Sequence, residues 1–529
     1  MGLIEAALDY VSIKNILVLF TIHFFLRMIC RSIDENIRLR RLGVRGSRVK
    51  SNMPFGLDII QKQVKASKNY KSVEYFLECL ENAPDYTAEA RILGRRVVLT
   101  ADPENIKAIL ATQFAEFGKG EQFHKDFSEF LGDSIFTTDG HIWHASRQLL
   151  RPQFSRERLS DLHCFESHLE TFFKAVANGG VLNGADQQVD MEAGNGKPLD
   201  ISELLFRYTL DVATDFLLGM DTQSLTTPRQ PFADAFNEVQ RIQGIISRSG
   251  PLRHFLPMKS FRSGLEVVNE FCNVYIERAL RLSPSELATK TKADEGYTFL
   301  HELASFTRDR KVLRDQLVAV LLAARDTTAA TLSFAFYELA RHPDAVRRLR
   351  AEIAGQVGLA RTPTYEDLKS MKFLQNVISE TLRLYPAVPF DVRTALQDTT
   401  LPRGGGPDGA APLPVLAGTA VTYSTLAMQR RADLYPSDAE DARAFAPQRW
   451  ARWQPRPWQY VPFNGGPRIC IGQQFALAEM AYVLTRVFQR FDRVESFMRE
   501  VDGGHPKLKT DIVVQPGDGV TVALWVAGT

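Results

Sequence analysis

The sequence predicts a mainly α-helical fold with small β-sheets, formed by one large mixed domain that follows an N-terminal apolar segment. From about residue 100 onward, apolar residues recur mainly at helical spacing, and only short stretches alternate as strands do. No internal repeat of solenoid or propeller period is found in the sequence. The 529 residues are 45% hydrophobic and 24% charged, which is typical of a folded globular protein rather than a disordered or fibrous one.

The longest helical pattern spans residues 312–340 and is rich in Ala and Leu. It ends before Arg341-His342-Pro343, because proline disfavours helix at the residue that precedes it. We expect this helix to cross the core. The Gly- and Pro-rich residues 401–414 instead predict a surface hairpin. A phosphate-binding loop is not expected there, since no Lys-Ser/Thr pair or helix start follows the glycines.

The N-terminal segment predicts a membrane anchor over residues 1–31, centred on the apolar run 16–26. Acidic residues precede the run and no small-residue cleavage site follows it, so we expect it to be retained. Many arginines follow, which predicts a basic linker over residues 32–60 and places the rest of the chain in the cytosol. A core helix or a helix lying in the membrane interface is the alternative.

The net charge of +2 is close to neutral for this length, which argues against nucleic acid as a partner. The five cysteines are scattered without any C-x-x-C pair, so a disulfide scaffold or a zinc ribbon is not expected and a reducing compartment is. His163, Cys164 and His168 invite a metal site, but they do not make a full ligand set. We interpret them, like His141 and His144, as surface or packing residues.

Cys470 differs from the other cysteines because it lies in a loop of small residues directly before the helical pattern 473–488. A thiol at a helix N-terminus meets unsatisfied N–H groups and the positive end of the helix dipole. Both lower its pKa and stabilise the thiolate. Gly466 and Gly472 would let a flat macrocycle approach the backbone. The loop therefore predicts a thiolate ligand for a metal ion.

This loop matches the signature F-x-x-G-x-R-x-C-x-G at Phe463, Gly466, Arg468, Cys470 and Gly472. In this the chain resembles the cytochrome P450 superfamily. The resemblance implies a mainly helical fold with small sheets, in which residues 61–529 are one catalytic domain. It also implies a haem cofactor with Cys470 as the axial thiolate, which favours cleavage of the O–O bond.

A second mark of the family is the E-x-x-R spacing of Glu380 and Arg383, which places both side chains on one face of a helix. Arg449, within Pro447-Gln448-Arg449-Trp450, resembles the third member of the family's Glu-Arg-Arg cluster. The resemblance implies that the three residues lock the fold around the haem, because a buried charge network destabilises strongly when one partner is removed.

A third mark lies in the long helix, where residues 323–328 resemble the family's oxygen-activating motif. The resemblance implies that Ala323 and Ala324 leave room over the iron, and that Asp326 and Thr327 are the catalytic acid-alcohol pair. A hydroxyl and a carboxylate that recruits water supply the protons that the reaction of dioxygen needs. Ala324 stands where the family often has glycine, which narrows the space above the haem slightly.

The haem propionates also have candidate partners. Trp143 and Arg147 fit the family pattern W-x-x-x-R, and Arg393 and Arg468 are further candidates by position. Guanidinium groups pair with carboxylates through two hydrogen bonds, so these residues suit the two propionates. The separate NADPH-dependent flavoprotein reductase from which such enzymes draw electrons could dock on the basic run Arg147, Arg151, Arg156 and Arg158, and a merely solvated helix is the alternative.

The resemblance is closest to the fungal branch that hydroxylates alkanes and fatty acids at the endoplasmic reticulum. It implies NADPH- and O2-dependent hydroxylation of a hydrophobic substrate, with the terminal carbon of a long-chain alkane, fatty acid or fatty-acyl-like compound as the first interpretation. Apolar residues that would suit a substrate tunnel include Ile135, Phe136, Val388 and Phe390.

Asp391 departs from that branch, where asparagine is expected. A carboxylate at the haem mouth would disfavour a fatty-acid carboxylate and could hydrogen-bond a hydroxylated or cationic substrate. We therefore keep a tailoring oxidase of a fungal secondary-metabolite pathway, acting on a polyketide, a terpenoid or a modified fatty acyl compound, as the alternative. A haem-thiolate isomerase or dehydratase and a non-catalytic haem protein are remote alternatives, because Asp326 and Thr327 are both retained.

Overall fold

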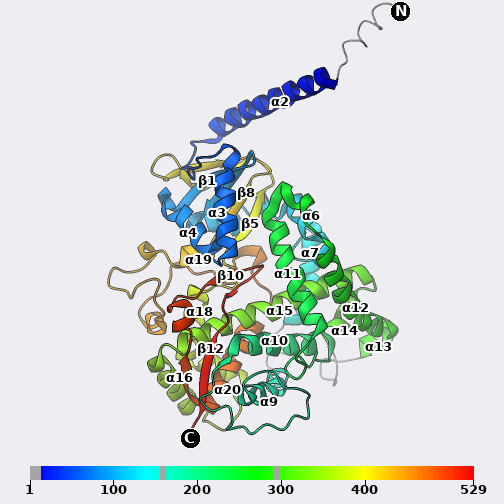
Figure 1. The fold of residues 1–529 in the computed structure, drawn as a ribbon, viewed down its shortest axis with the longest axis vertical. Helices are drawn as coiled ribbons and strands as arrows, with labels where there is room; N and C mark the ends of the chain where they lie inside the picture. Colours follow the sequence, from blue (N-terminus) through cyan, green and yellow to red (C-terminus); the bar gives the residue numbers. More distant parts are fainter. Residues whose placement is uncertain (1–12, 155–161, 290–297, 529) are drawn as a thin grey trace, which may run out of the picture.

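The structure is a computed structural model that describes residues 13–154, 162–289 and 298–528 (Figure 1). Helices form most of it, as the sequence predicts. The α-helices are α2 Ile13–Leu42, α3 Leu57–Lys68, α4 Ser72–Glu81, α5 Pro103–Lys107, α6 Gly120–Leu131, α7 Gly140–Leu150, α9 His163–Asn178, α10 Ile201–Leu218, α11 Pro231–Ser249, α12 Lys259–Arg281, α13 Pro284–Thr289, α14 Phe299–Phe306, α15 Arg310–Leu339, α16 Pro343–Gln356, α17 Tyr365–Ser370, α18 Lys372–Leu384, α19 Thr425–Gln429, α20 Gln473–Arg490 and α21 Arg499–Asp502.

Short helical turns and strands complete the fold. The turns are η1 Pro54–Gly56, η2 Pro84–Tyr86, η3 Ala108–Thr112, η4 Phe114–Glu116, η5 Arg151–Phe154, η6 Gly250–Phe255, η7 Ala432–Leu434, η8 Pro447–Ala451 and η9 Gly466–Arg468. The strands are β1 Thr87–Ile92, β2 Arg95–Thr100, β3 Phe117–Gly118, β4 Leu199–Asp200, β5 Asp391–Ala395, β6 Thr399–Gly405, β7 Ala411–Val415, β8 Ala420–Tyr423, β9 Phe491–Ser496, β10 Leu508–Thr510, β11 Val514–Pro516 and β12 Thr521–Val526.

The sheets are small. The main sheet has the order β1-β2-β8-β5-β3, in which only β2 and β8 run parallel. A three-stranded sheet, β4-β12-β9, and two two-stranded sheets lie elsewhere in the described part of the chain. One of the two is the β6–β7 hairpin, in which Leu401 faces Leu413, and it confirms the hairpin predicted over residues 401–414. The main sheet matters for the site because β5 carries Asp391 and Arg393 to the wall of the cavity.

Helix α15 forms the centre of the fold and confirms the predicted core helix. Asp309 caps its start by accepting hydrogen bonds from the backbone N–H groups of Lys311 and Val312, so the helix begins two residues before the apolar pattern does. Its first half lies in one apolar cluster with α11 and α12, and its second half lies in another with α18 and α20. Between the two halves, one side of the helix lines a cavity with Ala323, Ala324, Thr327, Thr328 and Thr331.

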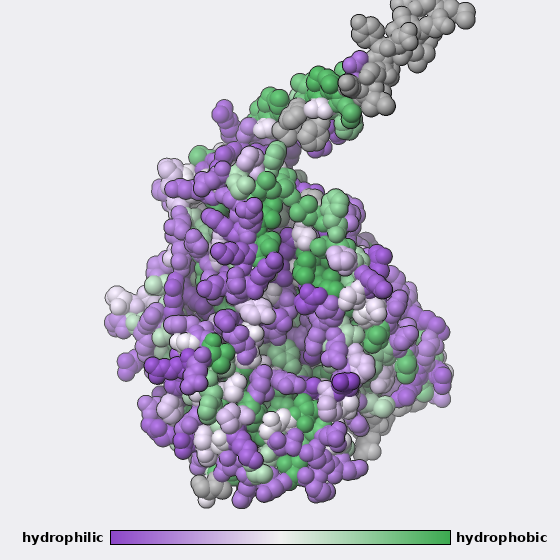
Figure 2. All heavy atoms as spheres, in the orientation of Figure 1, coloured by the Kyte–Doolittle hydropathy of each residue, from purple (hydrophilic) through white to green (hydrophobic). Residues whose placement is uncertain are grey.

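Helix α2 projects from the body of the molecule and exposes many large apolar side chains, which appear as green atoms along it in Figure 2. They are Leu17, Val18, Leu19, Phe20, Ile22, Leu26, Ile29, Ile33 and Ile37. Among the described helices, only α15 is long and apolar enough to cross a membrane by length and composition, and most of its apolar stretch is buried in the core. The anchor therefore stays a prediction, and residues 1–12 of it lie outside the described residues.

The boundary expected between anchor and linker, at residue 31, falls inside α2. The helix runs on to Leu42, and Arg38 on its last turns pairs with Asp398 of the main body at 2.5 Å. Residues 32–42 are therefore helical, and residues 57–60 already belong to α3. The extended linker that the basic composition predicts is limited to the short segment between these helices.

Candidate active site

A cavity with a volume of about 1530 Å³ reaches from the loop before α20 to α2 and α3. Ligand pockets commonly measure about 300–1,000 Å³, so this cavity can hold a large planar group and a substrate together. Of the predicted site residues it brings together Trp143, Arg147, Arg393, Phe463, Arg468, Cys470 and Gly472, the substrate candidates Ile135, Phe136, Ala323, Ala324, Val388, Phe390 and Asp391, and Thr327.

Cys470 lies at the cavity wall, three residues before the start of the predicted helix, which the structure forms as α20. Its backbone N–H donates to the carbonyl of Phe463 at 3.0 Å, which closes the loop, and the N–H of Gly472 donates to its sulfur. The Gly472 N–H and Arg147 both lower the pKa of the thiol, as expected, but burial dominates and raises it overall. The expected net decrease is therefore wrong for the protein alone, and a bound metal ion is what would deprotonate the thiol.

The two glycines of the loop have different roles. Gly466 has a φ of +66°, and a Cβ there would lie 1.9 Å from the carbonyl oxygen of Leu110. A Cβ at Gly472 would make only ordinary contact with the ring of Phe154, at 3.6 Å. The tight packing of the loop on η3 therefore requires glycine at position 466, and the approach of a macrocycle to its backbone stays a prediction.

The four predicted propionate partners all line the cavity, and three of them are arginines. The guanidinium of Arg468 lies 4.6 Å from the centre of the Trp143 ring and donates to the carbonyl of Thr138 at 2.8 Å. It also pairs with Asp139 at 2.5 Å, but its buried Nε has no hydrogen-bond partner in the described part of the chain. Burial and the nearby Arg393 lower the pKa of Arg468 to about 10, so it stays charged near neutral pH. The Nε–H of Arg468 can therefore donate a hydrogen bond to an anionic group that enters the cavity.

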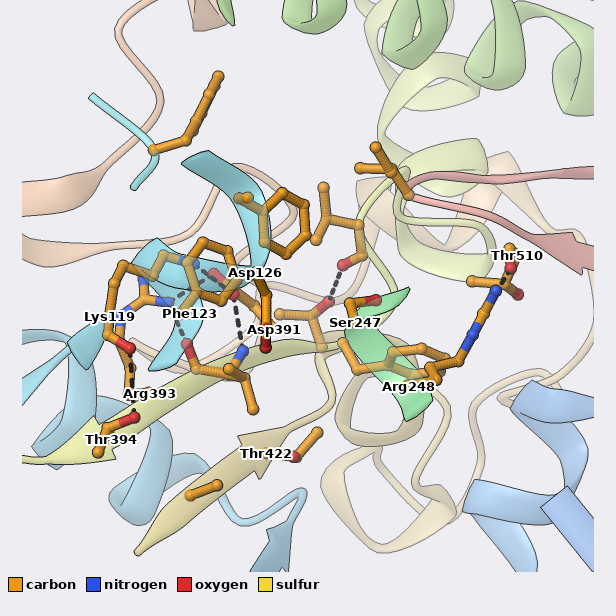
Figure 3. Close-up of a pocket in the computed structure, with 18 of the residues that line it drawn as sticks. Lys119, Phe123, Asp126, Ser247, Arg248, Asp391, Arg393, Thr394, Thr422 and Thr510 are labelled. Carbon is orange, nitrogen blue, oxygen red and sulfur yellow. Dashed lines mark hydrogen bonds and ion pairs between the residues drawn. The ribbon is translucent and has the colours of Figure 1, made fainter. Parts of the chain in front are cut away.

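Asp391 does not point a free carboxylate at a substrate, which corrects the interpretation from the sequence. Its two oxygens pair with Lys119 and with Arg393, each at 2.7 Å (Figure 3). The hydroxyl of Tyr423 also donates to it, at 3.2 Å. These cations hold the pKa of Asp391 well below its usual range. Lys119 was missed because nothing in its local sequence marks it. Only the fold places the residue before α6 against strand β5.

On α15, the alcohol and the acid of the predicted catalytic pair face different ways. Thr327 lines the cavity with Ala323 and Ala324, and its hydroxyl donates to the carbonyl of Ala323 at 2.7 Å. Asp326 is buried outside the cavity lining, 3.4 Å from Arg325, because successive residues of a helix point about 100° apart. One of its oxygens has no hydrogen-bond partner in the described part of the chain. The hydroxyl thus meets the cavity directly and the acid does not.

Glu479 of α20 is a buried acid that the sequence analysis missed, because a glutamate on a helix normally indicates a solvated face. Neither of its oxygens has a hydrogen-bond partner in the described chain, although Thr328 lies close enough to lower its pKa slightly. Burial without a cation raises the pKa of Glu479 to about 8, so it carries a proton at neutral pH.

The predicted structural cluster is assembled outside the cavity. Arg383 donates twice to Glu380, at 2.8 and 2.9 Å, and Arg449 donates to it at 2.9 Å. All three side chains are buried, and the remaining guanidinium N–H groups reach backbone carbonyls such as those of Ala442 and Ala444. The cluster joins α18 to η8 and to the segment before it.

These observations fit a haem. The cavity offers one sulfur ligand at Cys470, an unpartnered N–H at Arg468, and cationic groups at Arg147 and Arg393 that suit two propionates. The remaining wall is largely apolar, as a porphyrin face requires.

Comparison with known proteins agrees with this arrangement. The family model "Cytochrome P450" matches residues 54–518. Cytochrome P450 monooxygenase pvhE of Talaromyces variabilis is 53% identical over 495 residues, which cover 93% of this chain and 92% of that protein. Cytochrome P450 52A13 of Debaryomyces hansenii is 39% identical, with 89% of each chain covered. Cytochrome P450 52A1 of Candida tropicalis is 42% identical over 83% of this chain and 80% of its own. With its thiolate loop, its Glu-Arg-Arg cluster and this match over most of its length, the chain belongs to the cytochrome P450 family and is a monooxygenase of that family.

Proposed function

We propose that this monooxygenase hydroxylates an oxygenated hydrophobic intermediate of a specialised biosynthetic pathway, such as a polyketide, a terpenoid or a modified fatty acyl compound. The observation that carries the proposal is that polar groups occupy two opposite walls of a largely apolar cavity. Figure 3 shows the Lys119–Asp391–Arg393 cluster on one side and Arg248, which donates to the carbonyl of Thr510 at 2.7 Å, on the other. A plain alkane has no use for such groups, whereas an oxygenated substrate can hydrogen-bond to them.

The comparisons support the same choice. Identity to the pvhE monooxygenase is 53%, against 39% and 42% to the two 52A proteins, so the chain is nearer to a relative outside the 52A group. The interpretation that came first from the sequence, terminal hydroxylation of a long-chain alkane or fatty acid, becomes the second candidate. It is favoured by the length of the cavity, which runs from Cys470 past Phe123 and Phe136 to Val64 of α3.

In the proposed mechanism each residue has a physical task. Cys470 would ligate the haem iron, and Arg147, Arg393 and Arg468 would bind its propionates. The haem, once bound, supplies the oxygen-activating chemistry common to the family. Thr327 would pass protons at its hydroxyl to the reacting site, since it is the alcohol that faces the cavity. The apolar side chains around it would exclude bulk water.

The electron source and location belong to the proposal too. We infer that electrons come from NADPH through a separate flavoprotein reductase, and that the enzyme is held at the endoplasmic reticulum membrane with its catalytic domain in the cytosol. The exposed apolar residues of α2 support membrane association. Of the basic run expected to dock a reductase, Arg147 lines the cavity and Arg151 is exposed, whereas Arg156 and Arg158 lie outside the described residues.

Turnover by membranes that contain the enzyme and a reductase, supplied with NADPH and oxygen, tests the proposed substrate class. Long-chain alkanes and fatty acids are offered beside polyketide and terpenoid alcohols, and products are identified by mass spectrometry. Oxidised polyketide or terpenoid products with inert alkanes would support the proposal. Terminal hydroxy acids or dicarboxylic acids as the main products would move the second candidate to first place.

The Thr327→Ala variant tests the proton-delivery step. A positioned proton-transfer group contributes about 10²–10⁴-fold to the rate, so product formation is expected to fall by a factor in this range. NADPH consumption should continue, and hydrogen peroxide should accumulate. Thr331→Ala is the matched control, because Thr331 also lies on α15 and lines the cavity one turn further on. An unchanged product yield per NADPH in Thr327→Ala would contradict the assigned role.

A further inference from the structure

A cluster of potential metal ligands lies between α9 and α10, which pack side by side (Figure 1), and none of its residues lines the active-site cavity. Cys164 and His168 are one helical turn apart on α9, so both side chains point to the same side. Asp215 of α10 faces them. Its Oδ2 lies 3.1 Å from His168 Nε2 and 3.6 Å from Cys164 Sγ, and the three ligand atoms all lie within 4.8 Å of one another.

We propose that Cys164, His168 and Asp215 bind a zinc ion. Zinc bonds of about 2.3 Å to sulfur and about 2.0–2.2 Å to nitrogen and oxygen, arranged tetrahedrally, place ligand atoms about 3.3–3.6 Å apart. The separations of 3.1 and 3.6 Å lie within a few tenths of an ångström of that range. The third separation, between Cys164 Sγ and His168 Nε2, is within 4.8 Å, so side-chain rotation on α9 has to bring these two atoms to the zinc distance. A thiolate and an imidazole favour zinc over calcium or magnesium, which prefer all-oxygen ligands.

The surroundings of His168 are those of a histidine ligand. While Nε2 faces the proposed ion, Nδ1 lies 3.5 Å from Oδ2 of Asp221 on the opposite side of the ring. A carboxylate at the second nitrogen fixes the orientation of a metal-binding imidazole and raises its basicity. The segment that follows Asp221 is held by Asp211, which accepts hydrogen bonds from Thr222 and from the backbone N–H of Ser224, both at 2.7 Å.

Access to the site is open on one side. His168 is buried, whereas Cys164 and Asp215 are partly exposed, so an ion can enter and a water molecule can fill the fourth position. Three protein ligands with one open position are a recurrent zinc arrangement. The simplest competing interpretation is an ion pair between His168 and Asp215 with a cysteine beside it by chance.

The sequence alone did not indicate this site, because His163, Cys164 and His168 do not make a full ligand set. The third ligand comes from the next helix, 47 residues after His168, and only the packing of α9 on α10 brings it near. The neighbour of Cys164, Phe165, packs on Phe475 of α20 at 5.2 Å between ring centres. A zinc ion here would therefore clamp two helices beside the one that begins just after Cys470.

The test uses the purified full-length holoenzyme equilibrated with zinc chloride. We expect about one zinc ion per chain after removal of weakly bound metal, and a zinc X-ray absorption spectrum with one sulfur at about 2.3 Å. Thermal unfolding is expected at a higher temperature with zinc than after chelation. Asp221→Asn should weaken zinc binding by about 10–100-fold, as is typical for loss of a partner behind a metal ligand, and Cys164→Ser and Asp215→Asn should weaken it more.

Cys79→Ser is the matched control, because Cys79 is also a partly buried cysteine but lies outside the cluster. The haem absorbance of each variant checks that the protein is folded. Zinc affinity unchanged by Asp215→Asn and Asp221→Asn, or a zinc spectrum without sulfur, would overturn the proposal. Because Asp215→Asn and Asp221→Asn leave the size of the side chain unchanged, they decide the matter even if Cys164→Ser does not fold.

Discussion

Two carboxylates in this molecule are each held by two cations, yet Glu380 is fully buried and Asp391 is only half-buried. Around Glu380, Arg383, Arg449, the indole N–H of Trp450 and the backbone N–H of Ala446 satisfy both carboxylate oxygens. Asp391 pairs with Lys119 and Arg393 at the wall of the active-site cavity. We call the buried network around Glu380 the closed joint and the network of Lys119, Asp391 and Arg393 at the cavity the open cluster.

The two networks differ in the surroundings of their cations. Both arginines around Glu380 have further carbonyl partners and no face toward the cavity. At Asp391, burial and the neighbouring Arg393 lower the pKa of Lys119 to about 8. A closed network depends on every member, whereas a network at a cavity can take up water or a ligand when a member is lost. Disruption should consequently be costly at Glu380 and milder at Asp391.

The largest effect is expected from Glu380→Gln, which leaves two arginines buried without a counter-charge. Removal of one partner from a buried ion-pair network costs about 3–5 kcal/mol. Urea unfolding and haem content measure the loss. Glu121→Gln is the control, since Glu121 pairs with Lys125 on the exposed surface, where ion pairs contribute about 0–1 kcal/mol. Similar losses in both variants would contradict the special role of the closed joint.

The second effect concerns Glu479, the buried carboxyl group with no cation. Its folded pKa of about 8 lies above its ordinary value of 4.5, so the unfolded chain releases this proton first as pH rises. The group's contribution to stability is complete below pH 4.5 and is lost progressively up to about pH 8. Glu479→Gln does not titrate, so the difference in unfolding free energy between variant and wild type should change across this window. A constant difference would show that Glu479 is ionised in the folded state.

Asp391→Asn should cost less than Glu380→Gln, about 1–3 kcal/mol, because water in the cavity can solvate Lys119 and Arg393. Both cations already engage this carboxylate, so an oxygenated substrate would meet the N–H groups of Lys119 and Arg393 rather than Asp391. Substrate preference should therefore stay the same while stability falls. Urea unfolding and the product profile measured on one preparation test both halves of the statement. A changed substrate preference with unchanged stability would restore the direct substrate contact first inferred from the sequence.

These two clusters also show what the sequence could predict. Glu380, Arg383 and Arg449 were found because part of the cluster has a local helical spacing and the rest belongs to a known motif, and the same holds for Cys470 and α15. Lys119 and Glu479 were missed because their neighbours in space are far away in sequence. The sequence also could not predict that Asp326 points away from the cavity, because the motif gives the order of the residues but not how the helix is rotated relative to the cavity.

The smallest effect is expected from Tyr423→Phe, which tests how far the open cluster reaches toward the haem loop. The Tyr423 hydroxyl lies 3.2 Å from Asp391 and 3.0 Å from the amide oxygen of Asn464, which belongs to the loop before Cys470. A hydroxyl has one proton, so it donates to only one of them at a time, and its loss should cost about 0.5–1.5 kcal/mol. Urea unfolding measures this cost, and the haem absorbance reports whether the Cys470 loop is disturbed. If Tyr423→Phe lowered the free energy of unfolding as much as Glu380→Gln, the cluster at Asp391 would be a second closed joint. Its position on the cavity wall would then not make it less costly to disrupt.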